Sequence, residues 1–505
     1  MLESLQAAAA DVFAPRVLLV ILLSALWGLF VGAIPGLTAT MAVALLIPLT
    51  FFLDPTASLA AIVTLSACSI FAGDIPSTLV RIPGTPSSAA YTDDAYALAQ
   101  RGLHQRVLGN SLIFSVLGGL FGAVVLIIAA PSLARIATYF TTYEYFWLYV
   151  LGLSCAAIVS HGSRVKGTLA LVLGLLLSTV GLSEVHSVPR FTLGQDELLT
   201  GINFIPAMIG LFGVAEVLRN VLRSGGDIDR LETPAETGLG ETASQDETGA
   251  FAGVFHRMWS RPGSWLSASA IGTVIGVIPG AGADIAAWIS YAVSKRFSRH
   301  PEEYGRGSLD GVIDATSANN AALAGAWIPA LVFGIPGDSV TAIVIGVLLM
   351  KNVEPGPDIF VTQARLVHSL YLTFILANLL LVPLGYAAIR VGSLLVRIPR
   401  RVLMPMILLF CIVGSYAINA SEFDVAVMLA MGLLGFVLDV YEVPLGPVVL
   451  GIILGGQVEQ SFVQNLAKSD SLPAFFEQPL SLVLGGACLA LWLVPLLFRR
   501  RRKRD

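Results

Sequence analysis

Polar side chains gather around four Pro-Gly pairs in an otherwise apolar chain, at Pro35-Gly36, Pro83-Gly84, Pro279-Gly280 and Pro336-Gly337. Proline removes a backbone donor and glycine tolerates positive φ, so each pair is expected to interrupt a helix. A helix that restarts after such a break points its free N–H groups and its positive end at the break, which favours an anion. The pairs therefore predict an anion site, although the freed carbonyl groups could hold a cation instead.

The predicted substrate ligands are the four Pro-Gly pairs and the small polar residues that surround them. Those residues are Thr38, Thr40, Thr85, Ser87, Gly282, Ser317, Asn319, Asn320 and Ser339. Small hydroxyl residues also pack or cap helices in membranes, and for any single Ser or Thr this alternative stays open.

Two carboxylates stand out because they fall within apolar segments, Asp284 and Asp338. A carboxylate at membrane depth is costly and usually marks function, so both are predicted to couple an ion, Na⁺ or H⁺. The alternative is that they cap helices in a watery vestibule. A pair of carboxylates could also serve an intramembrane aspartyl protease, but the chain has no Gly-x-Gly-Asp motif.

The breaks occur in matching order in the two halves of the chain. Residues 32–42 (GAIPGLTATMA) and 276–286 (GVIPGAGADIA) share six of eleven identities. A second block, Ile75-Pro76 with Ile82-Pro83-Gly84, recurs as Ile328-Pro329 with Ile335-Pro336-Gly337. Repeats of this kind are a building plan of secondary transporters, in which the site lies between the repeats.

Composition places these breaks in a membrane. Of the 505 residues 55% are hydrophobic and 13% charged, against roughly 25% charged in soluble domains, and the mean hydropathy is +0.79. Apolar runs long enough to cross a bilayer recur along the chain. The predicted fold is an all-α polytopic membrane protein of about 12 membrane segments, including broken or re-entrant helices, with two structural repeats that we expect to be inverted.

An acidic linker divides the predicted halves. Residues 1–223 form the first half, 224–252 the linker and 253–505 the second half, because the stretch 224–250 holds seven carboxylates, one Arg and no apolar run. The basic tail Arg499 to Arg504 follows the last apolar segment, which predicts a cytoplasmic C-terminus. Four scattered Cys and six scattered His lack ligand spacing, so no metal site and no catalytic metal is predicted.

With these residues in view, the chain resembles the large membrane subunit of tripartite tricarboxylate transporters over almost its whole length. The resemblance rests on RIPGTPSSAAYTDDAYALAQRG at 81–102, SANNAALAGAWIPALVFGIPGDSVTAIVIG at 317–346, VEPGP at 353–357 and PLGPVVLGIILGGQVEQSF at 444–462. It implies a bacterial inner-membrane permease that imports small organic carboxylates on an ion gradient, with a small membrane subunit and a periplasmic substrate-binding protein as partners and no enzymatic activity. Nucleic acid is not an expected partner, and no cofactor is implied beyond the coupling ion.

Two positions depart from the family pattern. Many relatives have a Glu where this chain has Thr316, and a small residue where it has Asp338, so Thr316 joins the predicted ion-coupling residues. The segment 91–106 is expected to lie at a membrane surface as a connection. A single-component ion-coupled carboxylate carrier and a channel remain as alternatives, since the breaks would look alike and a filter is also built from polar groups.

Overall fold

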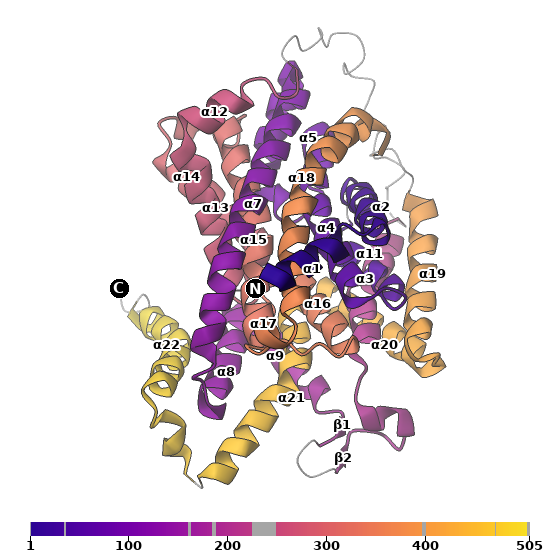
Figure 1. The fold of residues 1–505 in the computed structure, drawn as a ribbon, viewed down its shortest axis with the longest axis vertical. Coiled ribbons are helices and arrows are strands. Elements are labelled where there is room, and N and C mark those ends of the chain that lie inside the picture. The colour runs from indigo at the N-terminus through magenta and orange to yellow at the C-terminus, as the bar shows by residue number, and fades with distance from the viewer. Residues whose placement is uncertain are drawn as a thin grey trace.

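The structure is a computed structural model that describes residues 2–34, 37–159, 163–183, 188–224, 249–395, 400–469 and 471–501. Pro35-Gly36, most of the predicted linker 224–252 and the end of the basic tail lie outside the described residues. The described chain is a bundle of helices with one two-stranded sheet, in which β1 pairs with β2 in antiparallel register (Figure 1).

The first half of the chain contains helices and the two short strands. In order these elements are α1 Leu2–Val12, α2 Pro15–Gly32, α3 Ala39–Thr50, α4 Pro55–Ala72, α5 Asp74–Val80, η1 Ser88–Ala90, α6 Thr92–Leu98, η2 Ala99–Leu103, α7 His104–Ala137, α8 Thr142–Val159, α9 Arg164–Ser178, β1 Gly181–Leu182, β2 Pro189–Arg190, η3 Asp196–Thr200, α10 Phe204–Met208, η4 Ile209–Val214 and α11 Ala215–Ser224.

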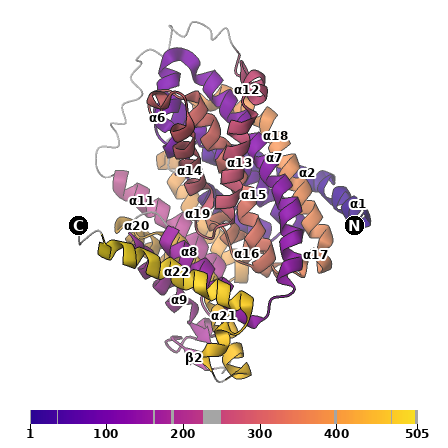
Figure 2. The same ribbon diagram turned by 90° about the vertical axis from the view of Figure 1, so that its left-hand side faces the viewer.

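The described residues of the second half form helices joined by loops and contain no strand. Its elements are α12 Val254–Ser260, α13 Pro262–Val277, α14 Gly282–Phe297, η6 Pro301–Glu303, α15 Leu309–Phe333, α16 Ser339–Met350, α17 Ile359–Thr362, α18 Ala364–Leu395, α19 Arg400–Asn419, α20 Glu422–Val440, α21 Leu445–Lys468, η7 Leu472–Phe476 and α22 Pro479–Arg501. Helices α13, α14 and α15 pack side by side (Figure 2).

Among the residues that the structure describes, eight helices are long and apolar enough to cross a membrane, and four shorter apolar helices accompany them. Apolar side chains on the outer surface fit this environment: Leu19, Leu23 and Leu26 of α2 are 48–56% exposed, as lipid-facing residues are. The prediction of a helical, polytopic membrane protein is thereby confirmed. The number of membrane segments, about 12, stays a prediction, since several helices are too short to cross the whole membrane.

Glycines make the same close contact in both halves. A Cβ on Gly28 or Gly32 of α2 would lie 2.4 Å from the carbonyl oxygen of Leu65 or Ser69 in α4. In the second half, a Cβ on Gly272 or Gly276 of α13 would lie 2.2 or 2.3 Å from the carbonyl oxygen of Ala318 or Ala322 in α15. Only glycine permits such approach of two helix backbones, which is how membrane helices commonly associate.

Gly276→Ala and Gly32→Ala are therefore expected to destabilise the folded protein by about 1–3 kcal/mol each, because the added methyl group must push two packed backbones apart. Gly263→Ala is the matched control, since a Cβ there meets nothing within 4 Å. Thermal unfolding of the detergent-solubilised variants measures the effect. Equal melting temperatures for Gly276→Ala and Gly263→Ala would contradict it.

The segment 91–106 is more than a surface connection. Tyr91 is 1% exposed and Asp94 is fully buried. The Asp94 carboxylate accepts hydrogen bonds from the backbone amides of Gly305, Gly307 and Ser308 at 2.7, 2.8 and 2.9 Å. Asp94 therefore ties the first half of the chain to the second, and the expected position of the segment at a membrane surface stays a prediction.

Candidate functional site

Three helices begin at one cavity of about 650 Å³, and each of them starts after a break. The first residues of α3, α14 and α16 form its wall, with residues from η4, α11, α20 and α21 opposite. Ten of the predicted site residues line it. They are Thr38, Thr40, Thr85, Ser87, Gly280, Gly282, Asp284, Asn319, Asp338 and Ser339.

Helix α3 begins with Thr38 as its N-cap residue. The Thr38 hydroxyl accepts a hydrogen bond from the Met41 amide at 3.2 Å, which satisfies one of the donors left over at a helix start. Ala39 and Thr40 follow in the first turn and also line the cavity. The N-terminal end of α3 therefore presents its partial positive charge to the cavity.

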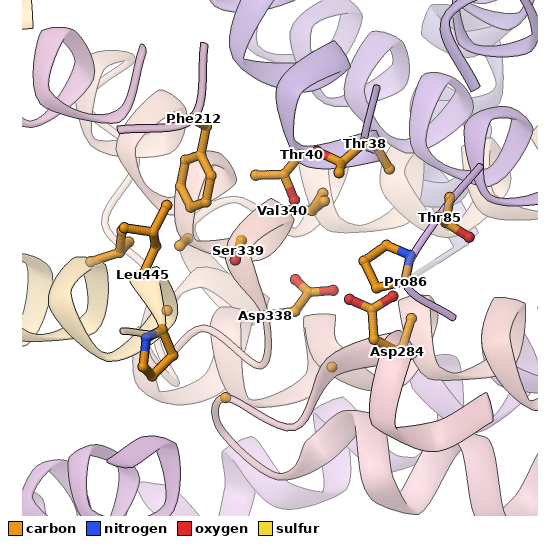
Figure 3. Close-up of a pocket in the computed structure, with 18 of the residues that line it drawn as sticks. Thr38, Thr40, Thr85, Pro86, Phe212, Asp284, Asp338, Ser339, Val340 and Leu445 are labelled. Atoms are coloured by element: carbon orange, nitrogen blue, oxygen red, sulfur yellow. The ribbon is translucent and has the colours of Figure 1, made fainter. Parts of the chain in front are cut away.

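Helix α16 begins in the same way, with a carboxylate as its cap. Asp338 Oδ1 accepts from the Thr341 amide at 2.8 Å and from the Thr341 hydroxyl at 2.7 Å, while that hydroxyl also accepts from the Asp338 amide at 3.0 Å. This capping box holds one carboxylate oxygen in place. Figure 3 shows the carboxylates of Asp338 and Asp284 directed into the same space, with Thr40 and Ser339 beside it.

The third break, before α14, depends on glycine. Gly280 has φ +78° and Gly282 has φ +61°, conformations that other residues rarely adopt. A Cβ on Gly280 would lie 2.6 Å from Cα of Ala156. The Gly280 amide donates to the Gly337 carbonyl at 2.9 Å, so the third and fourth breaks are joined directly by their backbones.

Hydroxyl groups organise the second break. The hydroxyls of Thr85 and Ser87 lie 3.0 Å apart, and the Thr85 amide donates to the Ser88 hydroxyl at 3.1 Å. The Asn319 side-chain amide of α15 donates to the Ser87 hydroxyl at 2.9 Å. Thr85 and Ser87 are 5% and 1% exposed, and they bring the first half of the chain against α15 at the cavity wall.

Charges line the cavity unevenly. Asp284 and Asp338 lie on the wall formed by the helix starts, and Glu216, Asp439 and Glu442 lie on the opposite side. Arg219 is the one basic residue among the lining residues that the structure describes. Its guanidinium pairs with Glu216 and lies 3.5 Å from Asp439. Glu442 pairs with Lys166, which does not line the cavity, at 3.1 Å, so the lining residues carry five carboxylates and one basic side chain.

Several predicted site residues do not line this cavity. These are Pro83, Gly84, Pro279, Thr316, Ser317, Asn320, Pro336 and Gly337, while Pro35-Gly36 lies outside the described residues. Gly84 and Gly337 have a packing role, because a Cβ on Gly337 would lie 2.6 Å from the Gly276 carbonyl oxygen.

Asn320 and Ser317 point into helix contacts instead. The Asn320 side-chain amide donates to the Ser115 carbonyl at 3.0 Å and to Asn378 Oδ1 at 2.9 Å. The Ser317 hydroxyl donates to the Ile313 carbonyl of its own helix at 2.8 Å. The structure therefore places Asn319 at the cavity and Asn320 between α7, α15 and α18.

Sequence reasoning missed the far wall of the cavity. Phe212, Arg219 and Leu445 line it, and Figure 3 labels Phe212 and Leu445. No Pro-Gly pair stands directly before any of them. Leu445 belongs to the PLGPVVLG stretch, which carried family resemblance without a predicted role. One feature of the sequence could have pointed to Arg219, namely that it is a basic residue at the end of an apolar run.

Comparison with known proteins identifies one family that matches most of the chain. The family model "Tripartite tricarboxylate transporter TctA family" matches residues 18–450. An uncharacterized 52.8 kDa protein in the TAR-I ttuC' 3'region of Agrobacterium vitis is 35% identical over 485 residues, covering 95% of this chain and 93% of that protein. An uncharacterized protein in the TAR-II ttuC' 3'region of the same organism is 36% identical over 239 residues, 46% of this chain and 97% of that protein. No solved structure matches.

Proposed function

We propose, from the premise that this chain belongs to the tripartite tricarboxylate transporter TctA family, that its cavity carries small organic carboxylates across the membrane together with a coupling cation. Membership makes the chain a transporter rather than an enzyme, so the aspartyl-protease alternative falls away.

The observation that carries the proposal is the convergence of three helix starts. Each helix N-terminus carries a partial charge of roughly +0.5 and free amide donors. The starts of α3, α14 and α16 together line one cavity, and anions bind to such ends without a dedicated basic side chain. Thr40, Thr85 and Ser339 add hydroxyl donors, which suits a carboxylate with its four lone-pair directions.

The carboxylates in the cavity support transport with a cation. An anion that entered beside Asp284 and Asp338 would meet like charges at short range, which disfavours binding. A Na⁺ ion or a proton at these carboxylates removes that repulsion and makes substrate binding depend on the ion. Symport follows from this dependence, because the substrate and the cation then occupy the cavity together.

The paired glycine contacts support two structural repeats. The helix pair α2–α4 and the helix pair α13–α15 use equivalent glycines, at spacings that also relate the Pro-Gly pairs. We expect the repeats to be inverted, with alternating access produced by movement of these helices against the rest of the bundle. The joined backbones of Gly280 and Gly337 would move as one unit.

The family description extends the proposal to partners and place. A tripartite system implies a substrate-binding protein and a small membrane subunit, and we propose both as partners of this chain. We place the chain in a bacterial inner membrane with its basic C-terminal tail in the cytoplasm, as the positive-inside rule predicts.

Uptake by the reconstituted protein tests the function. Proteoliposomes that contain the chain and the small membrane subunit are given radiolabelled citrate, with and without a binding protein and with an inward Na⁺ or H⁺ gradient. We expect accumulation that needs both a gradient and the binding protein. Accumulation without the binding protein would instead favour the single-component carrier, and an ohmic current without accumulation would favour a channel.

A further inference from the structure

A buried carboxylate outside the cavity has no role in the function proposed so far. Asp74 is 2% exposed and begins α5, inside the candidate span Pro55–Val80. It does not line the cavity. Burying an uncompensated carboxylate at such a place costs free energy, so a carboxylate that is nevertheless present there indicates a specific role for Asp74.

Three hydroxyl groups surround Asp74. The Tyr91 hydroxyl donates to Oδ1 at 2.5 Å, and the hydroxyls of Ser111 and Thr316 donate to Oδ2, the latter at 3.3 Å. In the described part of the chain, the side-chain partners of Asp74 are these hydroxyls and not a basic residue. Tyr91 and Ser111 are themselves buried, at 1% and 0% exposed.

The geometry fits a proton better than a metal cation. A Na⁺ ion between Asp74 and its neighbours would need to separate oxygens that already lie in direct hydrogen-bond contact. A proton needs no additional space. Added to the Asp74 carboxylate, it turns one oxygen from acceptor to donor, and one of the three hydroxyls rotates to accept.

The cluster spans both halves of the chain and reaches the cavity. Asp74 and Ser111 belong to α5 and α7, whereas Thr316 belongs to α15 of the second half. Thr316 lies one turn before Asn319, whose side chain holds Ser87 at the cavity wall.

We propose that Asp74, held by Tyr91, Ser111 and Thr316, is a proton-carrying group separate from the cation at Asp284 and Asp338, and that it couples substrate movement to a proton gradient. The inference deepens the proposed transport function and rests on it. When Asp74 takes up one H⁺, its carboxyl group donates a hydrogen bond between the two halves where the carboxylate accepted one. When the H⁺ is released, the carboxylate accepts that hydrogen bond again. The relative position of α5 and α15 then depends on the protonation of Asp74, which links the proton to the helices that line the cavity.

The test compares Asp74→Asn with Asp93→Asn in the full chain. Asp93 is the matched control, because it is exposed and pairs with Arg81 at the surface. Infrared difference spectra of the purified protein in lipid nanodiscs, recorded as pH is varied, report the carbonyl stretch of a protonated carboxyl group. We expect wild type and Asp93→Asn to share a titrating band that Asp74→Asn lacks.

Transport of labelled citrate in proteoliposomes with the partner proteins provides the second readout. Asp74→Asn is expected to lose stimulation by an inward proton gradient and to retain citrate exchange with citrate-loaded vesicles. Stimulation equal to that of wild type, or persistence of the titrating band in Asp74→Asn, would overturn the inference. Failure of wild type to take up citrate under any gradient would count against the transport function, while the infrared band would still decide the proton site.

Tyr91→Phe covers the case in which Asp74→Asn does not fold. It removes one donor to the ionised carboxylate and leaves the ring in place. Because the ionised form loses a hydrogen bond, the infrared transition is expected to move to higher pH by about one unit. An unmoved transition would mean that the titrating group is not Asp74.

Discussion

Asp338→Asn is expected to reduce carboxylate uptake by about 10- to 100-fold and to leave the folded protein in the membrane at wild-type amounts. Hydrogen bonds and ion contacts of a charged group are worth about 1.5–3 kcal/mol, which corresponds to that factor. Asparagine keeps an Oδ1 acceptor for the Thr341 amide, so the cap of α16 survives. The charge that we propose to bind the coupling cation is lost.

Thr341→Val separates the helix-capping role of the Asp338–Thr341 capping box from the role of the Asp338 charge. The Thr341 hydroxyl closes the capping box but does not line the cavity. Its loss is expected to lower the stability of the protein by about 1 kcal/mol and to leave uptake near wild type. Uptake rates should therefore fall in Asp338→Asn, whereas the temperature of thermal unfolding should fall in Thr341→Val. Full uptake by Asp338→Asn would refute a coupling role for this carboxylate.

The sequence was sufficient for the breaks and for much of the cavity wall. A Pro-Gly pair within an apolar run is expected to interrupt the helix there, so Gly280 and the start of α16 could be located from residue types and their order alone. The polar residues directly after the breaks, such as Thr40 and Ser339, could be predicted to line the cavity. They lie in the first turn of a helix that begins at the break, and that turn faces the cavity. These are local effects, and local effects can be read from sequence.

Contacts between distant segments could not be read in the same way. Asn319 and Asn320 are neighbours, yet one lines the cavity and the other holds α7 and α18, because successive helix residues point about 100° apart. Arg219 reaches the cavity through the packing of α11 against α20, η4 and α19. Asp74 was not among the predicted residues, although it is a carboxylate in an apolar run, and its three hydroxyl partners come from separate elements.

Proline at the first position of α16 or α3 tests the proposal that backbone amides bind the substrate. Ser339→Pro and Ala39→Pro each remove one N–H group that the helix itself does not need. The preceding residues are already extended, with φ/ψ of −149°/−177° at Asp338 and −92°/159° at Thr38, as a residue before proline prefers. Both helices are therefore expected to form normally.

Substrate affinity should nevertheless fall by about 10-fold or more for each proline variant, because an amide donor to a charged carboxylate is worth about 1.5–3 kcal/mol. Three controls isolate the amide. Ser339→Ala removes only the hydroxyl, Ala39→Val adds bulk but keeps the N–H, and Glu422→Pro places proline at the same position of α20, away from the cavity. The half-saturating substrate concentration for uptake measures the change. If the proline variants matched their Ala and Val controls, amide binding would be excluded at these two helix starts, and the hydroxyl groups and the bound cation alone would have to hold the anion.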